Sequence, residues 1–301
     1  MYQTLRYGVA LSVALFALSA NADLQQELDN LAPGSSFELP PETLSSLAIR
    51  VPGVSVSCAP ETVIDAAGQG NAVEILAERI TFSGCQVRNW GKDLNELDAG
   101  IFLAREAQGA VVENNRLQGP AFGVWLDATP DATVRDNHIR GDTSLRSQDR
   151  GNGIHLFNTT GALIEGNDII QTRDAIYIET ANRNTIRGNV MSDLRYGIHY
   201  MYSMHNLLEN NVTRGTRTGY ALMQSKYLKV FNNRSENDEN YGILMNFITN
   251  SELRNNVVTG VSQGQSAGVV ISGAEGKAVF IYNSLYNTFE GNYFGHSNIG
   301  I

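Results

Sequence analysis

One short pattern recurs about every 22 residues and restricts the fold of this chain more than any other feature. Each copy has an asparagine preceded by Gly, Asn or Asp, with an apolar residue three positions before the asparagine. The aligned asparagines are Asn115, Asn137, Asn167, Asn189, Asn211, Asn233, Asn256 and Asn292. Repeats of roughly 20 to 30 residues are typical of solenoids, in which each copy forms one coil that packs against its neighbours.

A second column, of small residues, runs in the same register and opens short runs of β-branched and aromatic residues. Its members are Gly100, Gly123, Gly153, Ala175, Gly197, Gly219 and Gly242, with Gly276 and Gly300 after an insertion. The runs alternate with a period of two and show no helical periodicity, which indicates strands. We therefore predict an all-β fold over residues 46–301, a right-handed parallel β-helix (β-solenoid) of about 22 residues per coil.

The asparagine column has a structural explanation. Stacked at one corner of consecutive coils, the amides can hydrogen-bond along a ladder and pair backbone groups that the turn would otherwise leave unsatisfied. The residue before each asparagine tolerates a left-handed backbone, as a tight turn requires. Two longer spacings mark insertions near 140–153 and 261–276, and loops inserted on one face of a solenoid often carry binding.

The N-terminus has the features of a secretory signal peptide over residues 1–22. It contains Arg6, an apolar stretch at 8–17 and a small-residue site that ends at Ala22. The apolar stretch is shorter than the roughly 20 residues of a membrane span. We expect cleavage after Ala22, a periplasmic mature protein, and an N-terminal cap segment over residues 23–45.

The charge balance and the chain end add three expectations. Lys and Arg number 22 against 31 Asp and Glu, a net charge of −9, so we expect no nucleic-acid partner, because few cations are present to neutralise phosphates. Cys58 and Cys85 can pair in an oxidising compartment, but the sequence leaves open whether their geometry allows it. The chain stops at Ile301, just inside a new coil, which predicts a C-terminally truncated β-helix because an uncapped coil exposes an unpaired edge.

Strand alternation assigns the side chains to two faces. Residues one and three positions after the second column, such as Ile176 and Ile178, are apolar and fill the interior. Residues two and four positions on face outward: Trp125, Asp127, His155, Phe157, Tyr177, Glu179, His199, Met201, Ala221, Met223, Leu244 and Asn246. An exposed apolar and aromatic strip is typical of a protein or ligand surface, unless a loop or a further part of the chain covers it. The predicted partner-binding residues are Trp125, His155, Phe157, Tyr177 and Leu244.

Part of this strip suits a soft metal. His199 and Met201 are two positions apart on one strand, and Met223 lies one coil further on. Met204 and His205 follow in the turn. Thioether and imidazole groups are ligands for Cu(I), and without a thiolate site we expect transient copper rather than a tightly bound cofactor. Methionine is equally common as an adaptable contact residue at protein interfaces, so a docking surface without metal is an alternative.

Carbohydrate chemistry is a second alternative. Asp127 and Glu179 share the outward column two coils apart, about 9–10 Å, at the edge of the separation used by inverting glycosidases. Phe157 stands between them, and no cluster of Asp, His and Arg surrounds either residue. A protein that binds or processes an acidic polysaccharide, with stacking on Trp125 and Tyr177, therefore remains the alternative reading.

Five segments resemble the NosD family of periplasmic accessory proteins for nitrous-oxide reductase maturation. They are DAGIFL (98–103), GIHYMYS (197–203), GYALMQSK (219–226), YGILMN (241–246) and GKAVFIYNS (276–284). The resemblance implies a β-helix that is an accessory protein and not an enzyme. Its implied partners are a membrane permease and a cytoplasmic ATPase in an ABC-type complex, a copper chaperone and the reductase, toward assembly of its copper–sulfide centre.

Overall fold

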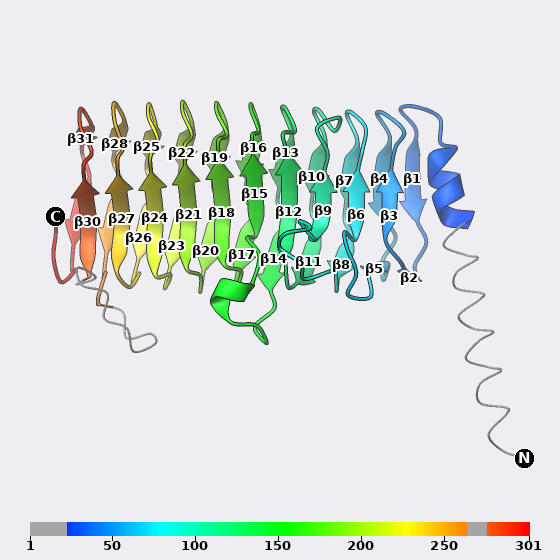
Figure 1. Ribbon diagram of the computed structural model, residues 1–301, viewed down its shortest axis with the longest axis horizontal. Helices are drawn as coiled ribbons and strands as arrows, with labels where there is room; N and C mark the ends of the chain where they lie inside the picture. Colours follow the sequence, from blue (N-terminus) through cyan, green and yellow to red (C-terminus); the bar gives the residue numbers. More distant parts are fainter. Residues whose placement is uncertain (1–22, 264–275) are drawn as a thin grey trace, which may run out of the picture.

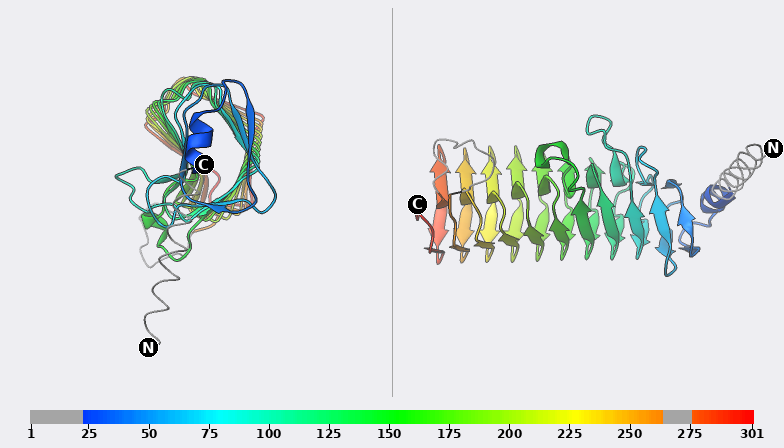
Figure 2. Two further views of the ribbon diagram at one scale, coloured as in Figure 1. Left: turned by 90° about the vertical axis from the view of Figure 1, so that its right-hand side faces the viewer. Right: turned by 90° about the horizontal axis from the view of Figure 1, so that it is seen from below.

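The computed structural model describes residues 23–263 and 276–301. The predicted signal peptide and most of the insertion at 261–276 lie outside these residues. The chain winds as a right-handed parallel β-helix, as the repeat predicted, and each full coil contributes one strand to each of three sheets (Figures 1 and 2). Strands of consecutive coils pair in parallel within each sheet, so the coils stack as a rod.

The three sheets, in stacking order, have the following strands. Sheet A contains β1(Ser36–Leu39), β4(Ser55–Cys58), β7(Thr81–Ser83), β10(Val111–Glu113), β13(Thr133–Arg135), β16(Leu163–Glu165), β19(Thr185–Arg187), β22(Leu207–Glu209), β25(Lys229–Phe231), β28(Glu252–Arg254) and β31(Thr288–Glu290). Sheet B contains β2(Thr43–Leu44), β5(Val63–Asp65), β8(Gln86–Arg88), β11(Arg116–Gly119), β14(His138–Gly141), β17(Asp168–Ile170), β20(Val190–Ser192), β23(Val212–Arg214), β26(Arg234–Glu236), β29(Val257–Thr259) and β32(Tyr293–Gly295). Sheet C contains β3(Leu47–Ile49), β6(Val73–Ile75), β9(Ala99–Leu103), β12(Phe122–Asp127), β15(Ile154–Phe157), β18(Asp174–Glu179), β21(Tyr196–Met201), β24(Thr218–Met223), β27(Tyr241–Asn246) and β30(Lys277–Tyr282).

Two non-strand elements accompany the coils. Residues 23–29 are helical and lie at the end of the first coil (Figure 1), where the Gln25 amide bonds both backbone groups of Ala48 and Leu28 is buried. The insertion near 140–153 forms the loop between β14 and β15 and contains the short 3₁₀ helix η1(Ser147–Asp149). The helical segment pairs backbone groups at the edge of β3, which would otherwise be open.

The interior is filled as the alternation predicted. Ile176, Ile178 and Tyr200 are fully buried between the sheets. The small-residue column lies where sheets B and C approach, and a Cβ at Gly197 would collide with the Thr213 side chain and the Gly219 carbonyl. The strand register places Ala278 beside Gly242, so the predicted position of Gly276 in this column is wrong by two residues. The prediction failed because the insertion before β30 changes the spacing between column residues of successive coils.

The eight asparagines form a continuous ladder along the corner between sheets A and B. Each Oδ1 after the first accepts hydrogen bonds from the backbone N–H and the side-chain amide of the asparagine one coil earlier, at 2.9–3.1 Å. Each Nδ2 also donates to a carbonyl of a preceding coil. The residue before each asparagine has a positive φ: Asn114, Asp136, Gly166, Gly188, Asn210, Asn232, Asn255 and Gly291. The residue types at that position therefore follow from the turn geometry.

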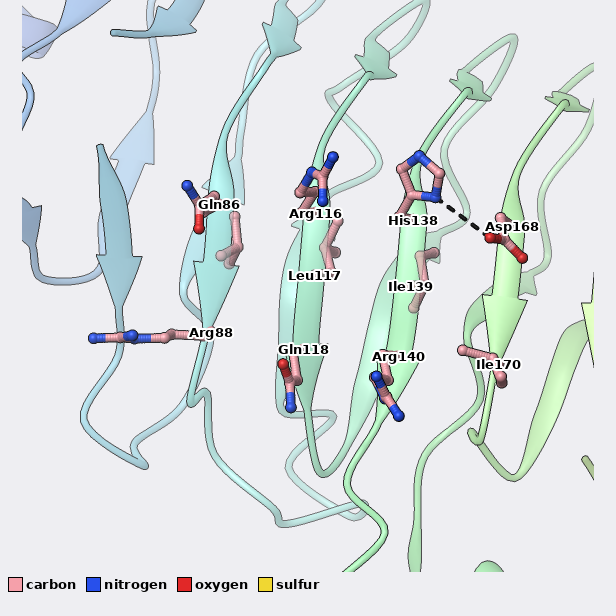
Figure 3. A pocket seen from close by; sticks show the side chains of 11 residues that line it. Gln86, Arg88, Arg116, Leu117, Gln118, His138, Ile139, Arg140, Asp168 and Ile170 are labelled. Atoms are coloured by element: carbon pink, nitrogen blue, oxygen red, sulfur yellow. Dashed lines mark ion pairs between the residues drawn. The ribbon is translucent and has the colours of Figure 1, made fainter. Parts of the chain in front are cut away.

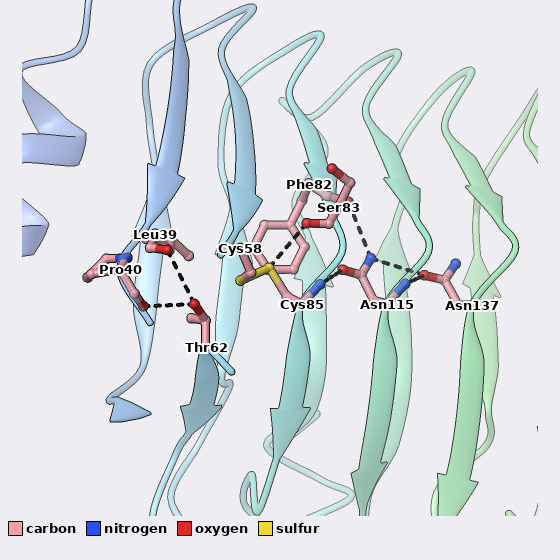
Figure 4. Close-up of a disulfide and its surroundings, with 9 residues drawn as sticks. All are labelled: Leu39, Pro40, Cys58, Thr62, Phe82, Ser83, Cys85, Asn115 and Asn137. Atoms are coloured by element: carbon pink, nitrogen blue, oxygen red, sulfur yellow. Dashed lines mark hydrogen bonds between the residues drawn. A yellow bond between two sulfur atoms is a disulfide. The ribbon is translucent and has the colours of Figure 1, made fainter. Parts of the chain in front are cut away.

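A disulfide between Cys58 and Cys85 closes the N-terminal end of this ladder (Figure 4). Cys85 occupies the ladder position one coil before Asn115, and its backbone N–H donates to Asn115 Oδ1 at 3.0 Å. The Cα atoms of the two cysteines are 5.0 Å apart, within the range that a disulfide bridges. The sequence left open whether the geometry of the two cysteines allows a disulfide. The structure shows that it does, because the pairing of β4 with β7 brings the two residues together.

Removing this disulfide is expected to lower the free energy of unfolding by about 2–4 kcal/mol, because the cross-link restricts the unfolded chain. The measurement is urea unfolding of the oxidised protein and of a Cys58→Ala/Cys85→Ala variant, each with and without reductant. The variant should be insensitive to reductant. An unchanged urea midpoint on reduction of the wild-type disulfide would contradict the prediction.

Candidate functional site

The outward face of sheet C carries two columns of side chains that run along the rod. The ring column contains Phe102, Trp125, His155, Tyr177, His199, Ala221, Leu244 and Phe280. The methionine column contains Asp127, Phe157, Glu179, Met201, Met223, Asn246 and Tyr282. Because the strands pair in register, neighbours in a column are about 4.8 Å apart along the backbone.

Four rings of the ring column stack on one another. Trp125 and His155 have centroids 4.1 Å apart, His155 and Tyr177 4.6 Å, and Tyr177 and His199 4.4 Å. The stack covers most of its own surface, because Trp125 is 5% exposed, His155 4% and His199 9%. The prediction that these three side chains are exposed is therefore wrong, although the face was assigned correctly.

Neighbouring side chains bury the Trp125 end of the stack. Phe122 packs edge-on against Trp125 at 4.6 Å, and Leu94 and Leu97 of the loop before β9 complete the cluster. A loop over the face was one of the alternatives that the sequence left open. Phe157, also predicted for partner binding, packs against the same cluster and stays partly exposed. The accessible part of the face thus begins at Phe157 and Tyr177 and continues to Leu244.

His155 is a neutral side chain within the stack. Burial lowers its pKa, and the carboxylate of Glu179 lies 3.4 Å from Nε2, longer than a normal hydrogen bond. Asn152 lies 3.3 Å from Nδ1. His155 therefore contributes packing between two aromatic rings at neutral pH.

His199 is held by a buried ion pair that sequence reasoning missed. Asp174, at the start of β18, accepts two hydrogen bonds from the Arg195 guanidinium at 2.8 and 2.6 Å. Its Oδ2 also lies 3.0 Å from His199 Nδ1. Burial would raise the pKa of Asp174, but the hydrogen bonds from His199 and Arg195 outweigh it and hold that pKa below its usual value. One sequence signal was present: an aspartate directly precedes Ala175 of the small-residue column.

This contact leaves one nitrogen of His199 available. With Nδ1 engaged by the Asp174 carboxylate, Nε2 is the ring nitrogen that can offer its lone pair to a metal. Nε2 is buried and makes no hydrogen bond within the described chain. A histidine whose second nitrogen is fixed by a carboxylate is the usual arrangement of a metal ligand.

Two thioethers lie beside this histidine. Met201 follows His199 by two residues on the same face of β21, and Met223 is its register partner on β24. Both side chains are partly exposed. The structure thus places three of the five predicted soft-metal ligands, one imidazole and two thioethers, in two adjacent columns of one face.

The other two predicted ligands lie beyond the end of β21. Met204 is 40% exposed and pairs with Lys226 through an isolated bridge, while the His205 ring stacks on Tyr227 at 4.8 Å. They lie on the corner between sheets C and A, whereas His199 lies on the face of sheet C. Among the residues that the structure describes, no three His, Cys, Asp or Glu side chains cluster as around a tightly held metal.

The carboxylates considered for carbohydrate chemistry remain separated. The register places Phe157 between Asp127 and Glu179, and Glu179 is directed toward His155.

In the described part of the chain, no helix is long and apolar enough to span a membrane.

Comparisons with known proteins agree on one family. A family model described as "Periplasmic copper-binding protein (NosD)" matches residues 135–301. A "Probable ABC transporter binding protein NosD" of Pseudomonas aeruginosa is 54% identical over 244 residues, which are 81% of this chain and 57% of the relative. The protein of the same description from Stutzerimonas stutzeri is 46% identical over 302 residues, which are 98% of this chain and 69% of the relative. The chain thus spans a little over half the length of the first of these relatives.

Solved structures share the fold. An exopolygalacturonase of Thermotoga maritima superposes with a TM-score of 0.63 at 11% identity and covers 91% of this chain and 87% of its own. An alginate lyase of Paenibacillus gives a TM-score of 0.60 at 15% identity and covers 92% and 96%. At such identities the likeness concerns the parallel β-helix alone.

Proposed function

The chain belongs to the NosD family of periplasmic copper-binding proteins, and from that premise we propose that it is a periplasmic accessory protein that binds copper transiently on the outward face of sheet C. In this proposal copper is cargo and no cofactor is tightly bound. The protein passes the metal on during assembly of the copper–sulfide centre of nitrous-oxide reductase, and it catalyses no reaction of its own.

One observation carries the copper proposal: Nε2 of His199 is a buried nitrogen without a hydrogen-bond partner, and the strand register places Met201 and Met223 in the neighbouring column of the same face. A buried polar atom without a partner needs an explanation, and a metal ion supplies one. One imidazole and two thioethers favour Cu(I) over harder ions. Asp174 and Arg195 would act as positioning residues, because they fix the ring orientation of His199.

The ligand set suits transfer better than storage. It contains no thiolate, since both cysteines are in the disulfide, and the methionine side chains are flexible and partly exposed. Met204 and His205, on the adjacent corner, would receive or release the ion as it enters or leaves the face. We propose them as secondary ligands for that reason.

The partners in this proposal are a membrane permease and a cytoplasmic ATPase of an ABC-type complex, a copper chaperone, and the reductase. The descriptions of the two relatives as ABC transporter binding proteins support the first pair. Large apolar side chains are exposed along the corner beside sheet C, among them Tyr202, Tyr227 and Phe247. Aromatic residues of this kind are enriched in protein interfaces, so the corner and the adjacent Tyr177 and Leu244 form the proposed contact surface.

Cu(I) titration against a competing chelator, under anaerobic conditions, tests the copper proposal. We expect the His199→Gln/Met201→Leu/Met223→Leu variant to lose stoichiometric Cu(I) binding, because these changes remove the donor atoms while nearly conserving volume. The Met204→Leu/His205→Gln variant should bind copper with weakened affinity.

The matched control is Met191→Leu/Met245→Leu, which removes two sulfurs from fully buried interior positions. It should bind Cu(I) like the wild type. The copper proposal fails if the wild type does not bind Cu(I), or if the control variant loses binding as completely as the triple variant.

A further inference from the structure

A groove of about 440 Å³ lies on sheet B, on a different side of the rod from the proposed copper face. Figure 3 shows its lining from strands β8, β11, β14 and β17. Two outward columns form it: Gln86, Arg116, His138 and Asp168 in one, and Arg88, Gln118, Arg140 and Ile170 in the other. The groove runs along the rod, across the strands.

The groove concentrates positive charge on an acidic protein. Three arginines line it against one carboxylate, Asp168, which lies 3.4 Å from His138 Nδ1 (Figure 3), whereas the chain as a whole has a net charge of −9. Arg88 is paired with Asp65, and Arg140 Nε donates to the Gln171 amide oxygen at 3.0 Å. Arg116 is exposed and has no ion pair or side-chain hydrogen bond within the described residues. A free guanidinium is a bidentate donor for a carboxylate.

The amides in the groove indicate a chain and not a single small anion. Gln86 and Gln118 alternate with Arg116 and Arg140 between neighbouring strands, and neither amide has a hydrogen-bond partner in the described part of the chain. A primary amide both donates and accepts, so it matches the N–H and C=O of a peptide backbone. Four strands span roughly 14 Å, which is about four residues of extended polypeptide.

The lining also argues against a neutral sugar. No Trp, Tyr or Phe side chain is among the lining residues, so the groove has no ring on which a pyranose could stack. Its floor consists of strand backbone with buried Leu117 and Ile139 beneath it. Recognition must therefore come from charge and hydrogen bonds.

We propose that this groove binds an extended acidic segment of a partner protein, whose carboxylates pair with Arg116 and Arg140 and whose backbone bonds Gln86 and Gln118. The segment lies along the rod and crosses β8, β11, β14 and β17. This surface is separate from the copper ligands, so it provides a second docking point and its occupancy does not depend on metal.

Fluorescence anisotropy with a labelled hexaglutamate peptide tests the proposal. Binding should be seen at about 20 mM salt and should weaken at about 200 mM salt, because the contacts are between exposed charges. We expect Arg116→Glu/Arg140→Glu to weaken binding at least about 10-fold, since charge-assisted hydrogen bonds are lost and like charges face each other. Gln118→Ala should weaken binding less.

The matched control is Arg105→Glu/Arg183→Glu, which reverses the charge of two exposed arginines on turns outside the groove. It should leave peptide binding within about 2-fold, because distant surface charges are screened. If both variants lose peptide affinity equally, the change in net charge alone explains the loss, and the proposal is overturned.

Two competitors separate the peptide from other anions. Citrate and an oligogalacturonate should compete poorly with the peptide. If oligogalacturonate binds and hexaglutamate does not, the groove is a polysaccharide site. If citrate binds as tightly as the peptide, the groove is a small-anion site. Neither result would affect the copper titration, so the two proposals fail separately.

Discussion

Asp174→Ala is expected to lower the free energy of unfolding by about 3 kcal/mol, because it leaves the Arg195 guanidinium and His199 Nδ1 without their buried acceptor. Asp174 is fully buried, and its carboxylate joins two consecutive coils through these contacts. The side chain of Arg195 is 21% exposed, so water regains part of the lost interaction. Urea unfolding followed by circular dichroism measures the change.

Glu165→Ala is the matched control for this prediction. Glu165 pairs with Arg187 of the next coil at 2.7 Å, but both side chains are about one-third to two-fifths exposed. An exposed pair of this kind contributes up to about 1 kcal/mol. Replacing both buried partners, as in Asp174→Leu/Arg195→Met, should recover part of the stability because no unpaired charge remains. If Asp174→Ala and Glu165→Ala lower the free energy of unfolding equally, the prediction is wrong.

The contribution of Asp174 should also depend on pH. Its pKa is lowered in the folded protein, so the folded state favours the ionised form. The stabilisation is therefore complete above the unfolded carboxyl pKa of about 3.9 and is lost as the pH falls through the lower folded value. The difference in unfolding free energy between wild type and Asp174→Ala should shrink below about pH 4.

Most of the architecture could be predicted because it repeats. The asparagine column and the period-two alternation each depend on contacts between identical positions of successive coils, and such contacts appear in the sequence as a fixed spacing. The register at β30 could not be predicted, because the insertion before it changes the spacing by an amount that no local pattern reveals. The disulfide depended on a relation between two different positions of neighbouring coils, which the repeat does not encode.

The candidate site was predicted only in part, because some of its contacts do not repeat from coil to coil. Alternation correctly placed His199, Met201 and Met223 on one face, but it says nothing of what lies over that face. Leu94 and Leu97 belong to a loop without a counterpart in other coils, so the burial of Trp125 had no repeating signal. Asp174 and Arg195 meet across coils from different columns, so only the folded structure shows that they hold His199.

Asn189→Ala is expected to be at least as destabilising as Asp174→Ala, with a loss of about 4 kcal/mol. Asn189 Oδ1 accepts from the backbone N–H and the side-chain amide of Asn167, and Nδ2 donates to Ile164, Arg187 and Asn211. Alanine leaves the Asn167 N–H and the Ile164 carbonyl buried and unpaired, and each such group costs about 1–3 kcal/mol. Asn189→Asp keeps the shape but removes the donor and adds a buried charge beside Asn211 Oδ1, so it should be no milder.

The position of Asn189 in the middle of the ladder adds a second expected result. In a solenoid each coil is stabilised mainly by its neighbours, so a gap at β20 weakens the coupling between the coils on either side. The urea transition should then broaden, with a lower slope, as the two parts begin to unfold separately. Asn95→Ala, at an exposed loop position, is the control and should change neither midpoint nor slope. A uniform shift of the midpoint with an unchanged slope would show that the ladder stabilises single turns and does not couple the coils along the rod.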